Sequence, residues 1–192
     1  GGDVEIEPRR QWPSGLEAPK GRIPADRQPL VGRALARIGD GGWGPIVDGL
    51  IDDPDKALPE ALIPAIAGVL KRWDWEDRPT WICPMPSRRR GRLIDAVAAE
   101  LGRLGKLPVH RALIGSDDGA YQSDMANSAH QLTNVWSRFS VDHSQFPHVG
   151  KLGGPVLLVD DEADSRWTLT VAAWRLSEAG VGPVLPFVLR SR

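Results

Sequence analysis

The sequence predicts an α/β fold in which a mostly parallel sheet of about five strands is flanked by helices. Residues 156–159 are apolar at every position, which is typical of a strand buried on both faces of a parallel sheet. Along residues 78–192, short apolar runs alternate with longer segments of helical spacing, as in an α/β core. Before this core we expect an extended arm over residues 1–28 and a small helical subdomain over residues 29–77.

The composition is typical of one soluble, cytoplasmic domain of ordinary size. The chain has 192 residues, of which 41% are hydrophobic, and contains no apolar run near the length of about 18 residues that a membrane span needs, so no membrane partner is expected. The formal net charge of −1 gives no overall field to attract nucleic acid. The single cysteine, Cys83, excludes an internal disulfide and a cysteine-based zinc site. Gly1 and Gly2 are interpreted as a cloning remnant, and the chain as part of a larger protein.

The N-terminal segment is expected to become helical after the arm. Residues 3–28 are rich in proline, glycine and charge and show no stable period, which favours extended structure. Apolar residues at helical spacing predict helices over residues 29–38, 43–51 and 58–73. The glycine-rich residues 39–42 end the first of them.

The core elements follow in alternation. A strand over residues 79–85 is followed by an arginine-rich turn, an amphipathic helix and a second strand over residues 107–114. Residues 115–126 form a long polar loop of the kind that serves as a mobile lid, with Tyr121 and Gln122 placed to cover a bound base. The later elements are a helix over residues 127–138, a brief strand at 139–141, the buried strand at 156–159, a helix from Thr168, and a last strand over 183–189 whose two prolines indicate a sheet edge.

Two adjacent carboxylates, Asp160 and Asp161, follow the buried strand, and about seven residues are expected between that strand and the next helix. In an open parallel sheet, ligands bind beyond the carboxyl ends of the strands, where a helix N-terminus offers unpaired N–H groups and a positive dipole to phosphate. Two carboxylates at such a position gain nothing for folding. They therefore indicate a binding site, and the alternative is that one of them caps the N-terminus of the following helix.

Residues 156–162, Val-Leu-Leu-Val-Asp-Asp-Glu, also resemble the first strand of a phosphoacceptor receiver domain. Such a domain needs most of its length after this strand, including a phosphorylated aspartate and a later lysine. Only 31 residues follow Asp161, and residues 167–192 contain no lysine. A receiver domain is therefore excluded, and the strand lies near the end of the fold.

The same stretch resembles the ribose-phosphate motif of type I phosphoribosyltransferases, in which an apolar strand is followed by two acids, two variable residues and a phosphate loop. The resemblance implies that Asp160 and Asp161 hold the ribose hydroxyls of phosphoribosyl pyrophosphate, with Mg²⁺ close to them, and that Asp164 acts as an acid or base. Arg166 stands where the family has glycine, and a Cβ there hinders close approach of the backbone to phosphate. The loop residues implied to bind the phosphoribosyl group are Ser165, Arg166, Trp167 and Thr168.

The order of elements over residues 78–192 resembles the ComF-like phosphoribosyltransferases. Short motifs add to this, namely Glu-Pro-Arg-Arg-Gln-Trp-Pro-Ser-Gly at 7–15, Lys-Gly-Arg-Ile-Pro at 20–24 and Met-Pro-Ser-Arg-Arg-Arg at 85–90. In combination they resemble the C-terminal region of bacterial RecQ-like DNA helicases that carry a phosphoribosyltransferase-like domain. No Walker A sequence is present, so the resemblance implies a helicase motor upstream of residue 1 and association with the nucleoid.

An arginine-rich turn is the second candidate site. Ser87, Arg88, Arg89 and Arg90 lie where the resemblance places pyrophosphate, and guanidinium groups suit bidentate contacts to phosphate. Three consecutive arginines repel one another unless an anion is near, so contact with pyrophosphate or DNA phosphate is expected. Changing all three arginines to alanine is expected to weaken such binding with little effect on the melting temperature.

Two functions from different classes remain open. The first is a non-catalytic accessory domain of a RecQ-like helicase that binds a phosphorylated nucleotide or sugar, or DNA. The second is an active phosphoribosyltransferase that uses phosphoribosyl pyrophosphate and Mg²⁺. Arg166 and Trp167 favour the first, because the Arg166 side chain must either turn away or occupy the phosphate position and meet the acids. Asp164, Ser165 and Thr168 keep the second open.

Overall fold

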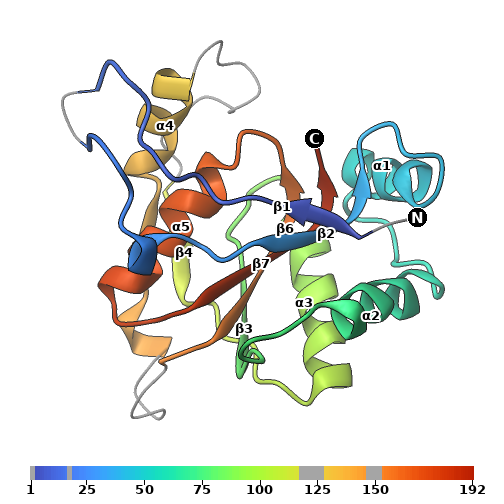
Figure 1. The fold of residues 1–192 in the computed structure, drawn as a ribbon. Helices are drawn as coiled ribbons and strands as arrows, with labels where there is room; N and C mark the ends of the chain where they lie inside the picture. Colours follow the sequence, from blue (N-terminus) through green and yellow to red (C-terminus); the bar gives the residue numbers. More distant parts are fainter. Residues whose placement is uncertain (1–2, 17–18, 117–127, 146–152) are drawn as a thin grey trace.

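The computed structural model describes residues 3–16, 19–116, 128–145 and 153–192, and its centre is a five-stranded sheet (Figure 1). In spatial order the strands are β1 (Val4–Ile6), β2 (Gly32–Arg37), β7 (Val184–Ser191), β6 (Val156–Ala163) and β3 (Trp81–Pro84). Strand β1 is antiparallel to β2, and the other three pairings in this sheet are parallel. The α/β class and the mostly parallel five-stranded sheet are thus confirmed.

Helices cover both faces of the sheet (Figure 1). On one face lie α1 (Gly44–Asp52), α2 (Leu62–Arg72) and α3 (Gly91–Gly105), and on the other α4 (Ser128–Trp136) and α5 (Trp167–Glu178). The remaining described elements are an antiparallel pair of strands beside α5, β4 (Leu113–Gly115) and β5 (Phe139–Val141), and two 3-10 turns, η1 (Ala25–Arg27) and η3 (His143–Gln145). Among the described helices, none has the length and apolar character to cross a membrane.

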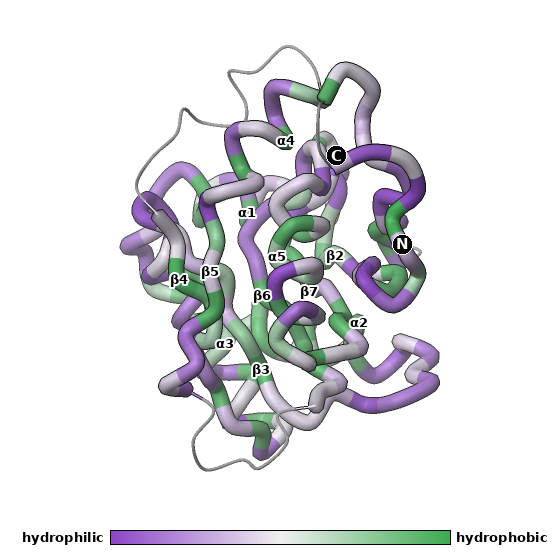
Figure 2. Tube along the Cα trace, turned by 90° about the vertical axis from the view of Figure 1, so that its left-hand side faces the viewer, coloured by the Kyte–Doolittle hydropathy of each residue, from purple (hydrophilic) through white to green (hydrophobic). Residues whose placement is uncertain are grey.

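Strand β6 is central, as its apolar run predicts. Residues 156–159 are at most 1% exposed, and they pair in parallel with β3 on one side and β7 on the other. Figure 2 shows β6 passing through the hydrophobic interior. The strand continues through both acids to Ala163, so only residues 164–166, the 164–166 loop, separate it from α5 instead of about seven residues.

The helix predicted over residues 29–38 is wrong, because this segment forms β2. Ala34 and Ala36 are buried, with 1% and 0% exposure. Gly32 packs so closely on β7 that an added Cβ would lie 2.6 Å from the backbone oxygen of Pro186. Small apolar residues suit a helix face as well as a strand between two neighbours. Here the backbone pairing offered by β1 and β7 outweighs a weak helical preference.

The edge position predicted for the last strand is also wrong. Strand β7 lies inside the sheet, between β2 and β6. Pro183 precedes the strand, and the pairing with β2 begins at Arg33 and Phe187, one residue after Pro186. Both prolines therefore stand before the first residue pair between β7 and β2, so their missing N–H groups interrupt none of the pairs with β2.

The strand predicted over residues 107–114 is reduced to two short pieces. Val109 forms an isolated parallel bridge with Ile82 of β3, and β4 pairs with β5 instead of the main sheet. Residues 117–126 of the expected lid, including Tyr121 and Gln122, lie outside the described residues.

The N-terminal arm packs on the core through an aromatic cluster. The Trp12 side chain is 7% exposed, and its ring makes edge contacts with Trp136 and Trp174 at centroid distances of 5.3 and 5.4 Å. It also stacks on Trp167 at 6.1 Å. Four of the eight tryptophans thus join the arm to α4 and α5.

Candidate functional site

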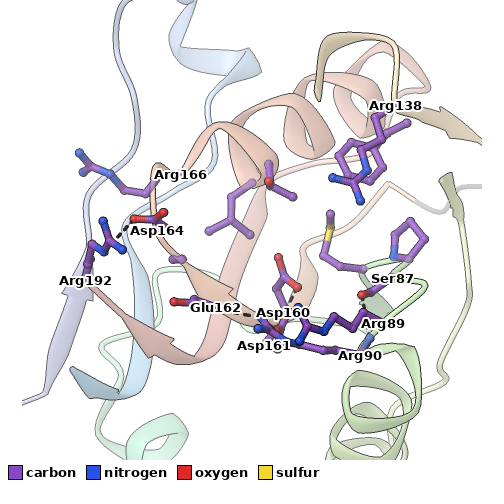
Figure 3. A pocket seen from close by; sticks show the side chains of 16 residues that line it. Ser87, Arg89, Arg90, Arg138, Asp160, Asp161, Glu162, Asp164, Arg166 and Arg192 are labelled. Atoms are coloured by element: carbon purple, nitrogen blue, oxygen red, sulfur yellow. Dashed lines mark hydrogen bonds and ion pairs between the residues drawn. The ribbon is translucent and has the colours of Figure 1, made fainter. Parts of the chain in front are cut away.

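A cavity of about 220 Å³ opens at the carboxyl ends of β3 and β6 (Figure 3). Its wall combines the arginine-rich turn before α3, the end of β6 and the start of α5. The two candidate sites of the sequence therefore meet in one place. Polar side chains in the wall come from Ser87, Arg89, Arg90, Arg138, Asp160, Asp161, Glu162, Asp164, Arg166, Thr168 and Arg192.

The acid pair is buried, with 6% exposure for Asp160 and 7% for Asp161. The backbone N–H of Asp161 donates to Oδ1 of Asp160 over 2.9 Å. Burial, and then the negative charge of Asp161, raise the pKa of Asp160 well above its usual range. The site thus makes Asp160 harder to ionise than an ordinary aspartate.

Arg90 binds the other acid of the pair, Asp161. Its Nη1 lies 2.6 Å from Oδ2 of Asp161 and 3.3 Å from Oε2 of Glu162. The backbone N–H of Arg90 donates to Oγ of Ser87 over 3.1 Å, which fixes the turn. The arginine that meets the acids is therefore Arg90 and not Arg166. A ligand hydroxyl that binds this oxygen of Asp161 has to share it with Arg90 or displace Arg90.

Glu162, to which the sequence analysis assigned no role, extends the ion pairs away from the cavity. Its Oε1 lies 3.0 Å from Nη2 of Arg190, whose Nη1 lies 2.6 Å from Oδ1 of Asp48 in α1. Arg90, Glu162, Arg190 and Asp48 therefore form an ion-pair chain from the cavity to α1.

Arg166 turns away from the acid pair (Figure 3). Its φ is +67°, in the left-handed region that favours glycine, and its Nη1 donates to the backbone oxygen of Glu7 over 2.9 Å. Beside it, Oδ1 of Asp164 lies 3.0 Å from Nε of Arg192. This ion pair engages one of the two Asp164 carboxylate oxygens.

Three residues predicted for the site do not line the cavity. Oγ of Ser165 accepts the backbone N–H of Trp167 over 3.3 Å and so satisfies the first N–H of α5. Trp167 is 1% exposed and packs against Trp12. Arg88 is exposed and adds nothing to the cavity wall.

Arg138 and Arg192 line the cavity although no sequence motif indicated them. Arg138 precedes β5 and Arg192 follows β7, so only the tertiary fold brings them to the site. With Arg89, Arg90 and Arg166 they place five arginines around four carboxyl groups. The charge balance of the cavity is therefore positive.

The acid pair does not fit the Mg²⁺ that the resemblance implies. Mg²⁺ is bound by charged carboxylates and other oxygen ligands in near-octahedral geometry, whereas burial raises the pKa of Asp160 and Asp161 is bound to Arg90. Across the described residues, no group of three or more His, Cys, Asp or Glu side chains is placed to hold a metal ion. The donor set suits an anion better than a cation.

The chain matches no protein-family model, and the comparison with curated proteins finds no match either. The resemblance to phosphoribosyltransferases and RecQ-like helicases thus remains a hypothesis. The fold class and the cavity are the observations on which a function has to rest.

Proposed function

We propose that this chain is a non-catalytic accessory domain of a RecQ-like DNA helicase, with a type I phosphoribosyltransferase-like fold, that binds a phosphorylated nucleotide or sugar. The single observation that carries the proposal is the arginine-lined cavity at the carboxyl ends of parallel strands. Open α/β sheets bind their ligands at this edge.

Phosphate is the ligand group that best suits the cavity. Arginines reach it from four parts of the chain, and guanidinium groups bind phosphate through paired, charge-assisted hydrogen bonds. Thr168 and Leu169, in the first turn of α5, are part of the wall. The first N–H groups of a helix add a favourable dipole for an anion.

Binding without turnover is supported by the state of the carboxylates. Arg90 holds Asp161, and Arg192 holds Asp164. A transferase needs such groups free to orient the ribose, and orientation supplies a large part of the rate in reactions of this kind. A ligand held by its phosphate alone leaves the reacting carbon poorly placed.

The helicase context rests on the N-terminal sequence motifs. Their residues Glu7, Arg9 and Trp12 contact the 164–166 loop or the start of α5, so the motif belongs to the same structural unit as the cavity. The upstream motor and DNA are the partners that this reading implies.

An active phosphoribosyltransferase is the second candidate, and one observation favours it. Asp160, Asp161, Asp164 and Thr168 all line the same cavity. The test is pyrophosphate release from phosphoribosyl pyrophosphate with Mg²⁺ and common purine or pyrimidine bases, for which we expect no detectable turnover. Robust turnover that is abolished by Asp160→Asn with Asp161→Asn would replace our proposal by this second one.

Two neighbouring arginines provide a matched pair for testing the preferred function. Both side chains are exposed, but Arg89 lines the cavity and Arg88 does not. We expect Arg89→Ala to weaken binding of adenosine 5′-monophosphate and ribose 5-phosphate by about tenfold or more, because one charge-assisted contact is lost. Arg88→Ala should leave both affinities unchanged. Isothermal titration calorimetry measures all four values.

The outcomes separate a cavity ligand from DNA. Equal losses from Arg88→Ala and Arg89→Ala, with single-stranded DNA as the bound ligand and a steep dependence on salt, would indicate binding along the surface of the turn. A parent chain that binds none of the phosphorylated probes refutes the proposal. The triple change that includes Arg90 is unsuitable, since it leaves Asp161 and Glu162 without this cation and so alters stability.

A further inference from the structure

The N-terminal arm holds the 164–166 loop at two points. The guanidinium of Arg9 donates twice to the backbone oxygen of Ser165, from Nε over 3.0 Å and from Nη2 over 2.7 Å. In the opposite direction, Nη1 of Arg166 donates to the backbone oxygen of Glu7 over 2.9 Å. Arg9 and Ser165 are 156 residues apart in sequence. The loop that the arm holds is also part of the cavity wall, through Asp164 and Arg166.

Arg9 lies on the N-terminal arm, but Trp12 and not Arg9 holds the arm on the core. Its guanidinium lies 4.6 Å from the ring centroid of Trp167, within the range of a cation–π contact. Trp12 is buried independently against Trp136 and Trp174. Since Trp12 supplies the buried apolar area, the arm is expected to stay docked when the Arg9 side chain is removed. The contacts of Arg9 then act on the loop.

The Arg9 contact sets the direction of a loop N–H. A peptide unit is planar and trans, so its C=O and N–H point in opposite directions. Because the carbonyl of Ser165 is bound by Arg9, the N–H of Arg166 points away from Arg9. The φ of +67° at Arg166 is strained for a residue with a Cβ and persists only while its surroundings hold it.

We propose that Arg9 is a positioning residue for the 164–166 loop and couples docking of the N-terminal arm to ligand binding in the cavity. The proposal rests on the proposed function and identifies the arm as a regulator of that same site. Coupling between two sites is reciprocal, so whatever the docked arm adds to ligand affinity, the ligand adds to arm docking.

Electrostatics predicts that ligand binding and docking of the arm favour each other. Partial burial, and then the positive charge of Arg166, lower the pKa of Arg9 from its ordinary value. Two guanidinium groups that repel each other at one loop are both stabilised by an anion beside it. A bound phosphate therefore strengthens the contact between arm and loop.

The test compares Arg9→Ala with a matched change at the next residue, Arg10→Ala. Arg10 is exposed and forms a surface ion pair with Glu7 at 3.4 Å. We expect Arg9→Ala to weaken binding of adenosine 5′-monophosphate by about tenfold and Arg10→Ala to leave it unchanged. Arg9→Lys keeps the charge without the planar pair of donors, so its affinity should fall between the two. Calorimetry is done at a temperature at which melting curves show every variant folded.

Amide hydrogen exchange gives a readout that needs no ligand. Arg9→Ala should speed exchange at residues 164–169 while residues 156–159 of β6 stay as protected as in the parent. Adding adenosine 5′-monophosphate to the parent should slow exchange at arm residues 7–12. This protection should disappear in Arg9→Ala.

The failures of the two proposals are distinguishable. Unchanged affinity and unchanged exchange at residues 164–169 in Arg9→Ala would overturn the role of Arg9, as would equal effects from Arg10→Ala. If the parent binds no phosphorylated probe, the proposed function and the coupling to a ligand both fail. In that case, amide hydrogen exchange at residues 164–169 in Arg9→Ala still tests whether Arg9 positions the loop. Faster exchange than in the parent supports this role, and unchanged exchange overturns it.

Discussion

Arg166 and Lys106 have positive φ values of 67° and 52°, a conformation that costs a residue with a Cβ about 1–2 kcal/mol. The two positions differ in what the side chain contributes. Arg166 donates to the backbone of Glu7, whereas Lys106 is exposed at the end of α3. The strain at the 164–166 loop is therefore offset in part by contact with the arm, and the strain at the end of α3 is not.

Glycine substitutions at these two positions should stabilise the protein to different extents. Lys106→Gly is expected to raise the free energy of unfolding by about 1 kcal/mol, because glycine removes the strain at a helix end. Arg166→Gly should gain less, because it also removes the hydrogen bond to Glu7. Urea unfolding of the two variants measures the difference, and equal gains would mean that the Glu7 contact adds nothing. Adding Trp167→Ser would confuse the result, since loss of this buried ring costs about 3–5 kcal/mol.

Asp160 should make the protein less stable as the pH rises. Its pKa is raised in the folded protein above the usual 3.8, so the unfolded chain loses this proton first. Above about pH 4 the unfolded state binds fewer protons at this group, and its contribution to the free energy of unfolding falls until the folded group ionises too. Asp160→Asn cannot ionise, so its stability relative to the parent should increase with pH in urea unfolding. A difference that stays constant with pH would contradict the burial argument.

At the scale of elements, the sequence correctly predicted the helices and strands whose residue pattern fits only one type of secondary structure. An apolar run without alternation can be buried only between two neighbours, as in β6, and the regular apolar stripe of α3 fits only a helix. The residues of β2 fit the spacing of a helix as well as that of a strand. Hydrogen bonding to β1 and β7 in the folded protein selects the strand. The sequence also did not determine that β7 lies inside the sheet. The pairing with β2 begins after Pro186, and this starting point depends on how the whole sheet is assembled.

The arm was predicted as extended, but its contribution to stability was not visible in the sequence. Trp12 is 7% exposed and contacts three other tryptophan rings. We expect Trp12→Ala to lower the free energy of unfolding by about 3–5 kcal/mol, as for other buried aromatic residues. Trp43→Ala, at a half-buried position, is the control and should cost clearly less. Similar costs in thermal or urea unfolding would show that the aromatic cluster adds little.

At the scale of the whole molecule, the site could be located from the sequence but not completed. The acid pair and the arginine turn each follow a strand, and parallel strands end at one edge, so their meeting was predictable. Arg138 and Arg192 belong to no motif, and the N-terminal motif that contains Arg9 does not follow a strand that ends at this edge. Their positions depend on contacts between distant segments, and a single sequence holds no periodic signal for such contacts.

The ion-pair chain is the feature that joins these distant parts, and Glu162 is its centre. It contacts Arg90 before α3 and Arg190 of β7, which in turn contacts Asp48 of α1. The side chains of Glu162 and Arg190 are only 19% and 16% exposed, so solvent screens their attraction less than it screens a surface pair. Loss of the charge at Glu162 therefore affects two arginines at once.

Glu162→Gln should lower the free energy of unfolding by about 1–3 kcal/mol, since both arginines keep a second carboxylate partner but lose this one. Glu178→Gln is the matched control, because Glu178 pairs with Arg175 at the exposed end of α5. It should cost less than about 0.5 kcal/mol. Urea unfolding at low and high salt distinguishes the two, because added salt should reduce the cost at Glu178 more than the cost at Glu162. Equal costs with equal salt dependence would show that the chain behaves as a set of independent surface pairs and does not link the cavity to α1.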